Sequence, residues 1–279
     1  MVIVAARESE NRKSGPKAAD LMLRAKALRL NNALQKNLQQ EQDLFRQVLA
    51  LEPNNASAMV GFAGSLAVEA SNFDSQMDEC VTEKKWVEAR DLALRAKELD
   101  PENPDVYFAL GSYTRSYGDR AGALRALETR LSLEPKNPSA YNSLAVVFYF
   151  DGEPQKSIEL LTQAINLDPK YPTPNVLGGM GRAYFMLGDN DAAIEWIQKC
   201  LETTPGWISW YEYALLAMAY ANKGDDARAR TAAGELRRLN PNIKLSEFVD
   251  KPDSASTAAY KKWFETKLVP AWRKAGLPE

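Results

Sequence analysis

The chain of 279 residues contains no histidine and only two cysteines, Cys80 and Cys200. Histidine is the commonest general base and metal ligand in proteins, so its absence excludes every catalytic triad and metal site that depends on it. Two isolated cysteines neither complete a zinc site nor form a disulfide framework. The glycine-rich string Gly178 to Gly181 lacks the Lys-Ser/Thr pair of a phosphate-binding loop. We therefore expect no metal, no cofactor and no enzymatic activity of the chain's own.

Long apolar runs are also missing. None approaches the roughly 18 residues that a membrane-spanning helix needs, and the opening MVIVAA is too short for the core of a signal peptide. The formal net charge is −2, and residues 31–250 carry 22 Lys and Arg against 31 Asp and Glu. A surface that binds phosphates needs the opposite balance. The sequence therefore predicts a cytoplasmic protein with no membrane insertion and no nucleic-acid binding by this segment.

The most regular feature that is present is a series of prolines, each of which closes an apolar helical stretch. From the second proline onward they recur at intervals of 34, 34, 36 and 36 residues. Small residues keep the same spacing, and a small side chain allows two helices to pack closely. The prolines are Pro53, Pro101, Pro135, Pro169, Pro205 and Pro241, and the small residues are Ala89, Ala123, Ser157, Ala193 and Ala229. Two markers with one spacing predict an array of helix pairs.

Other positions repeat with the array. The first helix of a pair carries a large–small pair of residues one turn after an aromatic or aliphatic residue, as in Tyr141 with Leu144 and Ala145. A glycine followed by an acid predicts the turn between the two helices, because glycine adopts the left-handed conformation and an acid suits the N-terminus of the next helix. These turns are Gly118-Asp119, Gly152-Glu153, Gly188-Asp189 and Gly224-Asp225. A divergent first pair is predicted around Leu21 and Phe45.

These features resemble the tetratricopeptide repeat, a helix–turn–helix unit of 34 residues that closes with a proline. The resemblance covers residues 18–241. It implies an all-α fold, a right-handed superhelix (α-solenoid) with about six helix pairs and a C-terminal capping helix. Residues 1–17 are then a flexible or partial N-terminal segment, and residues 242–279 are a linker and the capping helix.

A narrower resemblance is carried by the segments AADLMLRAKAL, LFRQVLALEPNNASAMVGFA and WRKAGLPE. They are similar to the C-terminal repeat region of bacterial class III adenylate/guanylate cyclase-like proteins and related winged-helix regulators. In that group the repeats follow a catalytic or DNA-binding domain. The resemblance therefore implies that this chain is a regulatory part of a larger bacterial signalling protein.

Repeat arrays of this kind bind proteins, so the candidate site is the concave groove lined by the first helices. Projecting the repeat onto the sequence gives a largely apolar and aromatic surface with two arginines. Its residues are Phe108, Ser112, Arg115, Asn142, Val146, Tyr149, Phe150, Arg182, Phe185, Met186, Tyr211 and Met218. Such a groove suits a peptide or an amphipathic helix, and the arginines suit an acidic group on it. We expect a non-catalytic interaction or regulatory scaffold; the alternative is a self-association module that oligomerises an attached signalling domain.

Two departures from the repeat could give the array its individual function. The interval from Pro53 to Pro101 is 48 residues, which either lengthens a helix pair or projects an acidic loop. Beyond Pro241, aromatic and apolar residues share one face of a predicted helix: Tyr260, Trp263, Phe264 and Leu268, followed by Trp272. This tail either caps the end of the array, which a solenoid needs, or enters the groove as an internal ligand.

Overall fold

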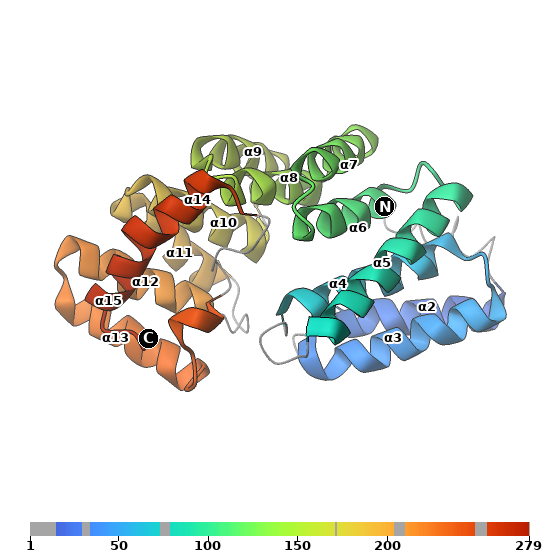
Figure 1. The fold of residues 1–279 in the computed structure, drawn as a ribbon, viewed down its shortest axis with the longest axis horizontal. Helices are drawn as coiled ribbons and strands as arrows, with labels where there is room; N and C mark the ends of the chain where they lie inside the picture. The colour runs from blue at the N-terminus through green and yellow to red at the C-terminus, as the bar shows by residue number, and fades with distance from the viewer. Residues whose placement is uncertain are drawn as a thin grey trace. The chain divides into compact units, whose positions relative to one another are not determined.

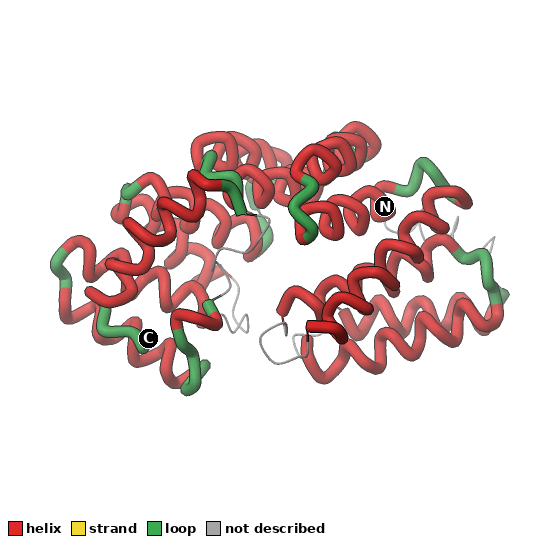
Figure 2. The backbone as a smooth tube through the Cα atoms, viewed as in Figure 1, coloured by secondary structure: helices red, strands yellow, loops and turns green. Residues whose placement is uncertain are grey.

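The computed structural model describes residues 15–29, 34–72, 79–170, 172–203, 210–248 and 256–278. Within these ranges all regular secondary structure is helical, and the connections that they include are short turns and loops (Figures 1 and 2). The chain forms two compact units, Met1–Tyr113 and Thr114–Glu279. None of the described helices combines the length and the hydropathy that a bilayer crossing requires. The N-terminal segment predicted to be flexible lies outside the described residues as far as residue 14.

In chain order, the first twelve described helices make six successive pairs, as the repeat spacing predicts. Each second helix ends two residues before the proline that closes its repeat, wherever that end is described. The bounds of the pairs are α2 Pro16–Arg29 with α3 Leu34–Leu51, α4 Ala56–Asn72 with α5 Glu79–Leu99, α6 Pro104–Ser116 with α7 Arg120–Leu133, α8 Pro138–Phe150 with α9 Pro154–Leu167, α10 Pro174–Leu187 with α11 Asn190–Thr203, and α12 Trp210–Lys223 with α13 Asp226–Leu239.

The N-terminal unit has its own apolar core, in which α2 packs on α3 and α4 packs on α5. Phe45 of α3 lies so close to Gly61 of α4 that an added Cβ at residue 61 would be 2.3 Å from the ring. The divergent first pair predicted around Leu21 and Phe45 is confirmed, because both residues are buried in this core. The extra residues between Pro53 and Pro101 lengthen α4 and α5 to 17 and 21 residues, and residues 73–78 lie outside the described ranges.

A polar network joins three helices of this unit. Gln42 of α3 donates a hydrogen bond to Glu69 of α4 (2.7 Å), and Lys85 Nζ of α5 lies 2.8 Å from Glu69 Oε2. Burial raises the pKa of Glu69, but the hydrogen bonds from Lys85 and Gln42 outweigh it, so this pKa lies below its ordinary value of 4.5. The ionised form of Glu69 therefore stabilises the lengthened helix pair.

This network predicts an acid-sensitive contribution to stability. A lowered folded-state pKa stabilises the fold above the ordinary value of 4.5, and the contribution is lost as pH falls through the folded-state pKa. We expect Glu69→Gln to lower the free energy of unfolding by about 1–2 kcal/mol at neutral pH and by less in acid. Urea unfolding at both pH values measures this, with the exposed Asp43→Asn as the control. Equal losses at the two pH values would contradict the prediction.

The C-terminal unit stacks the pairs α8/α9, α10/α11 and α12/α13 (Figure 1). The small residues predicted to allow close helix packing here are all buried. They are Ala123, Ser157, Ala193 and Ala229. Ion pairs between turns also tie neighbouring pairs together, since Arg120 lies 2.6 Å from Asp151 and 3.1 Å from Glu153. The repeat thus fixes both the core and the edge of the stack.

The turns between paired helices confirm the glycine–acid prediction. Gly118, Gly152, Gly188 and Gly224 all have positive φ, from 75° to 85°. The side chains of three of the following acids accept a hydrogen bond from a backbone N–H three residues on: Asp119 from Gly122, Asp189 from Ala192, and Asp225 from Arg228. Glu153 makes no such bond. Its side chain instead joins the ion pair with Arg120.

Four short elements follow the last pair. They are η2 Leu245–Glu247, α14 Ala258–Trp263, a π-helical turn η3 Phe264–Leu268, and α15 Val269–Lys274. Pro270 would stop or kink a single continuous tail helix. It lies in the first turn of α15, where its missing N–H is tolerated, and the wider π turn lies just before it.

Candidate partner-binding groove

Aromatic side chains from the ends of consecutive first helices line the inner face of the C-terminal unit. Tyr149 and Phe150 end α8, Phe185 and Met186 lie near the end of α10, and Tyr211 lies at the start of α12. Tyr149 and Phe150 meet edge to face, with ring centroids 5.2 Å apart. These residues lie next to one another because α10 contacts both α8 and α12.

The two arginines predicted for the groove pack against these rings. The guanidinium of Arg182 lies 5.0 Å from the ring centre of Tyr211 and 6.0 Å from that of Tyr149. Arg115 lies 5.0 Å from the ring of Phe150. Such cation–π contacts hold the guanidinium groups at the groove surface. That they bind an acidic group of a partner stays a prediction.

The first half of the C-terminal tail lies on this aromatic surface. The ring of Tyr260 in α14 lies 5.7 Å from Tyr149 and 5.2 Å from Phe150. Trp263, one turn further on, lies 6.2 Å from Tyr149 and 6.4 Å from Phe185. Tyr260 is 0% exposed. The groove residues Tyr149, Phe185 and Met186 are thus buried beneath a helix of the same chain.

The start of α14 is fixed by Thr257. Its hydroxyl donates a hydrogen bond to the backbone oxygen of Asp151 (2.8 Å) and accepts one from the backbone N–H of Tyr260 (3.2 Å). Burial raises the pKa of the Asp151 side chain in spite of its hydrogen bond with Arg120. An added Cβ at Gly152 would lie 3.1 Å from Ala259, so the turn after α8 has no room for a larger residue beneath α14.

Replacement of Thr257 tests this anchor. Thr257→Val keeps the shape of the side chain but removes both hydrogen bonds, so we expect the free energy of unfolding to fall by about 1 kcal/mol. The same change at Thr231, whose exposed hydroxyl bonds only its own helix, is the control. Thermal or urea unfolding of the two variants measures the difference. Equal effects would show that the contact with Asp151 contributes nothing.

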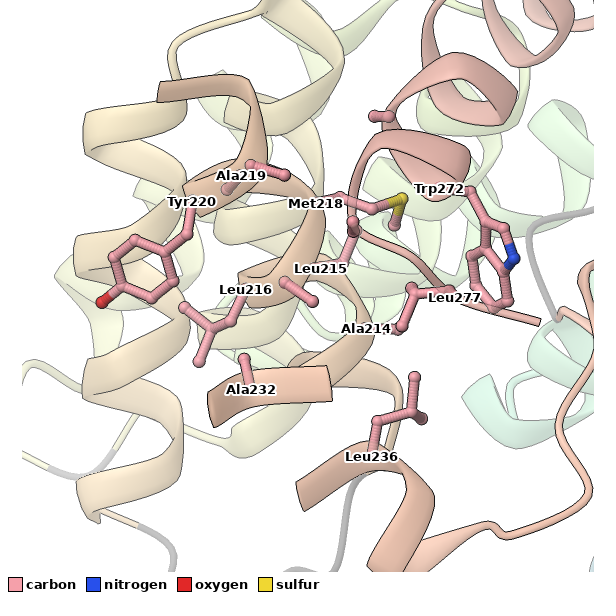
Figure 3. Close-up of a cluster of buried hydrophobic side chains, with 14 of the residues drawn as sticks. Ala214, Leu215, Leu216, Met218, Ala219, Tyr220, Ala232, Leu236, Trp272 and Leu277 are labelled. Atoms are coloured by element: carbon pink, nitrogen blue, oxygen red, sulfur yellow. The ribbon is translucent and has the colours of Figure 1, made fainter. Parts of the chain in front are cut away.

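The second half of the tail packs elsewhere. Phe264, Leu268 and Trp272 join the large core formed by α12 and α13, where Trp272 and Leu277 lie beside Leu215 and Met218 (Figure 3). Polar contacts hold the same stretch: Arg237 of α13 donates to the oxygen of Gly276 (2.9 Å), and the Trp272 indole donates to that of Pro278 (2.7 Å). The two halves of the tail thus pack on different parts of the unit: α15 packs on the last helix pair, and α14 lies against the predicted groove residues.

The remaining candidate residues lie outside the aromatic contacts with α14 described above. Phe108 and Ser112 belong to the N-terminal unit, and Phe108 is 39% exposed. Asn142 and Val146 lie half-buried on α8, and Met218 is fully buried in the core under the tail. Sequence reasoning missed Phe248, whose ring stacks on Tyr211 at 5.0 Å. It also missed Thr257, although a threonine just before an apolar helical run is a typical N-cap.

The described residues include no group of three His, Cys, Asp or Glu side chains arranged to hold a metal ion. Lys156 forms a surface ion pair with Glu153, and Lys223 forms one with Asp191. Such exposed pairs contribute little to stability. The concentration of aromatic rings, rather than any cluster of charges, distinguishes the inner face of the C-terminal unit.

Comparison with known proteins gives the repeat its name. The tetratricopeptide repeat family matches residues 108–172, and a second description of this repeat matches residues 174–206. No curated protein matches the chain. Neither family match is to a cyclase or a winged-helix region, so the narrower resemblance is not supported.

Solved structures agree with the family match. PilF of Pseudomonas aeruginosa has a TM-score of 0.56 at 17% identity, and covers 83% of this chain and 96% of its own. PilW, a type IV pilus biogenesis factor, has a TM-score of 0.60 at 13% identity, with coverage of 82% and 96%. A thermophilic tetratricopeptide-repeat protein of Thermus thermophilus has a TM-score of 0.57 at 16% identity, with coverage of 74% and 98%. Residues 108–172 and 174–206 thus match tetratricopeptide repeats, and the fold of the chain is the all-α solenoid of helix pairs that such repeats build.

Proposed function

We propose that this chain is a non-catalytic scaffold that binds a helical segment of a partner protein on the inner face of its C-terminal unit. One observation carries the proposal: that face already holds a helix, α14, against Tyr149, Phe150 and Phe185. Tetratricopeptide repeats commonly mediate protein–protein interactions. The surface of this chain therefore has both the architecture and the side chains for such a contact.

The chemistry of the face favours a helix with aromatic anchors. Apolar grooves recognise amphipathic helices through side chains spaced three or four residues apart, as Tyr260 and Trp263 are. Aromatic residues and arginines supply most of the binding energy in protein interfaces, and this face contains both. Arg115 and Arg182 lie against its rings, so both kinds of side chain are gathered on this face.

The proposal does not depend on the resemblance to cyclase-like proteins. Location in the cytoplasm and attachment to a signalling domain stay predictions from the sequence. Self-association stays the alternative function, and static light scattering at high protein concentration tests it: a monomer at all concentrations would contradict it.

A peptide selection tests the proposed function. The target is the chain with Tyr260→Ala and Trp263→Ala, because these two rings cover the aromatic surface. We expect a display library of amphipathic helical peptides to yield binders with dissociation constants of about 1 µM or tighter, which is about −8 kcal/mol. A library that yields no binder for the folded target would contradict the proposal.

A matched pair of phenylalanines on α8 locates the binding surface. Phe150 contacts Tyr260 and Arg115 on the inner face, whereas Phe148, also half-buried, lies beneath Lys156 and packs towards α7 and α9. In the same target we expect Phe150→Ala to weaken the selected peptides about tenfold or more, and Phe148→Ala to leave their affinity unchanged. Equal effects of the two substitutions would place the binding site elsewhere.

A further inference from the structure

The tail of the chain divides into two parts that differ in how they are held. Trp272, Leu268 and Phe264 belong to the large core of the unit, and Tyr260 belongs to a separate small cluster with Tyr149 and Met186. The backbone around α15 is held by Arg237 and by the bond from Leu245 N–H to the oxygen of Pro278 (3.2 Å). Trp263 packs against both clusters, and the release of Tyr260 and Trp263 would leave the core contacts of Phe264, Leu268 and Trp272 in place.

An interruption of the regular α-helix separates the two parts. The π-helical turn Phe264–Leu268 lies between α14 and α15, and Pro270 follows it. A π turn interrupts the regular i to i−4 ladder, and proline removes one further N–H donor, so the helix is weakest at this point. Movement of α14 about this turn breaks no regular α-helical segment, because α14 ends at Trp263 and α15 begins at Val269.

Contacts with the groove support the α14 segment. It is the first part of a helical stretch that continues through η3 and α15 to Lys274, and its six residues would be too few to form a stable helix alone in water. Its conformation is supported by Tyr260, by Trp263 and by the Thr257 cap on the backbone oxygen of Asp151. A second helix that brings the same anchors would meet the same rings and the same carbonyl oxygen.

We propose that the seat of α14 is the docking site for a partner helix that carries two aromatic residues three positions apart, preceded by a Ser or Thr cap, and that α14 is its internal competitor. This inference rests on the proposed function. It adds the residue pattern that the partner helix must carry and the way in which α14 regulates partner binding. Because α14 belongs to the same chain, its effective concentration near the seat is high. The apparent affinity for a partner is therefore reduced in proportion to the fraction of molecules in which α14 has left the seat. Binding displaces α14, while α15 continues to cover the end of the array.

The test uses a fluorescent peptide of residues 256–268 and measures its affinity for the full chain by anisotropy. We expect the Tyr260→Ala/Trp263→Ala chain to bind this peptide about tenfold or more tightly than the unmodified chain does. Lys262→Ala alters an exposed residue of α14 and should behave like the unmodified chain. A control peptide with alanine in place of Tyr260 and Trp263 should bind none of these three chains.

Equal affinities of the unmodified and doubly substituted chains would overturn the inference, even if library peptides still bind and the proposed function stands. Circular dichroism checks that the doubly substituted chain is folded. Should it fail to fold, Thr257→Val serves in its place, and an unchanged peptide affinity in that variant would also overturn the inference. If two copies of the chain exchange α14 in a dimer, a second copy and not a different protein occupies the seat. That result would overturn the assignment of the seat to a partner protein.

Discussion

Replacement of Trp272 by alanine is expected to lower the free energy of unfolding of the C-terminal unit by about 3–5 kcal/mol. Trp272 is 0% exposed, its ring centroid lies 5.0 Å from that of Phe248, and it lies beside Leu277 and Met218 in the core of Figure 3. Truncation removes a large buried apolar surface and leaves a cavity that movement of α12 and α15 cannot fill. It also leaves the oxygen of Pro278 without its indole donor.

Trp263→Ala is the matched control in the same tail. Trp263 is only partly buried and packs against both the smaller cluster and the large core, so its truncation removes less buried apolar surface and we expect a loss of about 1–2 kcal/mol. Urea unfolding followed by circular dichroism measures both variants. Comparable losses for Trp272→Ala and Trp263→Ala would show that α15 and α14 contribute equally to stability. That result would contradict the division of the tail into two differently packed halves.

Two glycine-to-alanine substitutions are expected to act with opposite sign. Alanine normally stabilises the interior of a helix relative to glycine by about 0.5–1 kcal/mol. Gly234 of α13 is exposed with no atom within 4 Å of an added Cβ, so Gly234→Ala should show this gain. At Gly181 of α10 the added Cβ would lie 2.4 Å from Ile197 Cγ1 of α11. Gly181→Ala should therefore destabilise the unit by about 1–3 kcal/mol through overpacking.

A double-mutant cycle identifies the cause. If the clash with Ile197 is responsible, Gly181→Ala costs less in a chain that already carries Ile197→Ala, because the crowding atoms are gone. Denaturant unfolding of the four chains gives the coupling free energy. A stabilising effect of Gly181→Ala in the unmodified chain would contradict the interpretation of this position as the small residue of the repeat.

The sequence predicted the parts of the fold that repeat. Gly118 and Asp119 identify a turn because left-handed backbone and helix capping are local properties, and Ala193 identifies a close helix contact because its spacing recurs. Glu153 shows where the pattern loses detail: it occupies a capping position, but the neighbouring Arg120 draws its side chain into an ion pair. Such competition between local and neighbouring contacts is set by the stacking of pairs.

The position of the tail could not be derived in this way. Tyr260 and Trp263 are identified as one helical face by their spacing, but what covers that face is set by contacts with residues more than a hundred positions earlier, such as Asp151. No repeat copies this segment, so periodicity carries no information about it. Repeat register alone assigns Phe108 to the groove; it belongs to the N-terminal unit, so its place in the groove stays a prediction.

In the proposed function, α14 keeps an aromatic surface covered until a partner is present. Tyr149, Phe185 and Met186 would expose apolar surface if α14 were absent, and large exposed apolar patches favour non-specific association. Under this proposal only a partner with well-matched aromatic anchors would gain enough from the contact to displace α14.

The most direct test observes the contact between α14 and the groove. In the free chain we predict nuclear Overhauser effects between the ring protons of Tyr260 and those of Tyr149 and Phe150, whose ring centroids lie 5.7 Å and 5.2 Å away. A saturating unlabelled peptide of residues 256–268 should remove these effects and replace them with contacts from the peptide to the same two rings, while the contact between Trp272 and Phe248 persists. Ring contacts of Tyr260 that survive with the peptide bound would contradict the account.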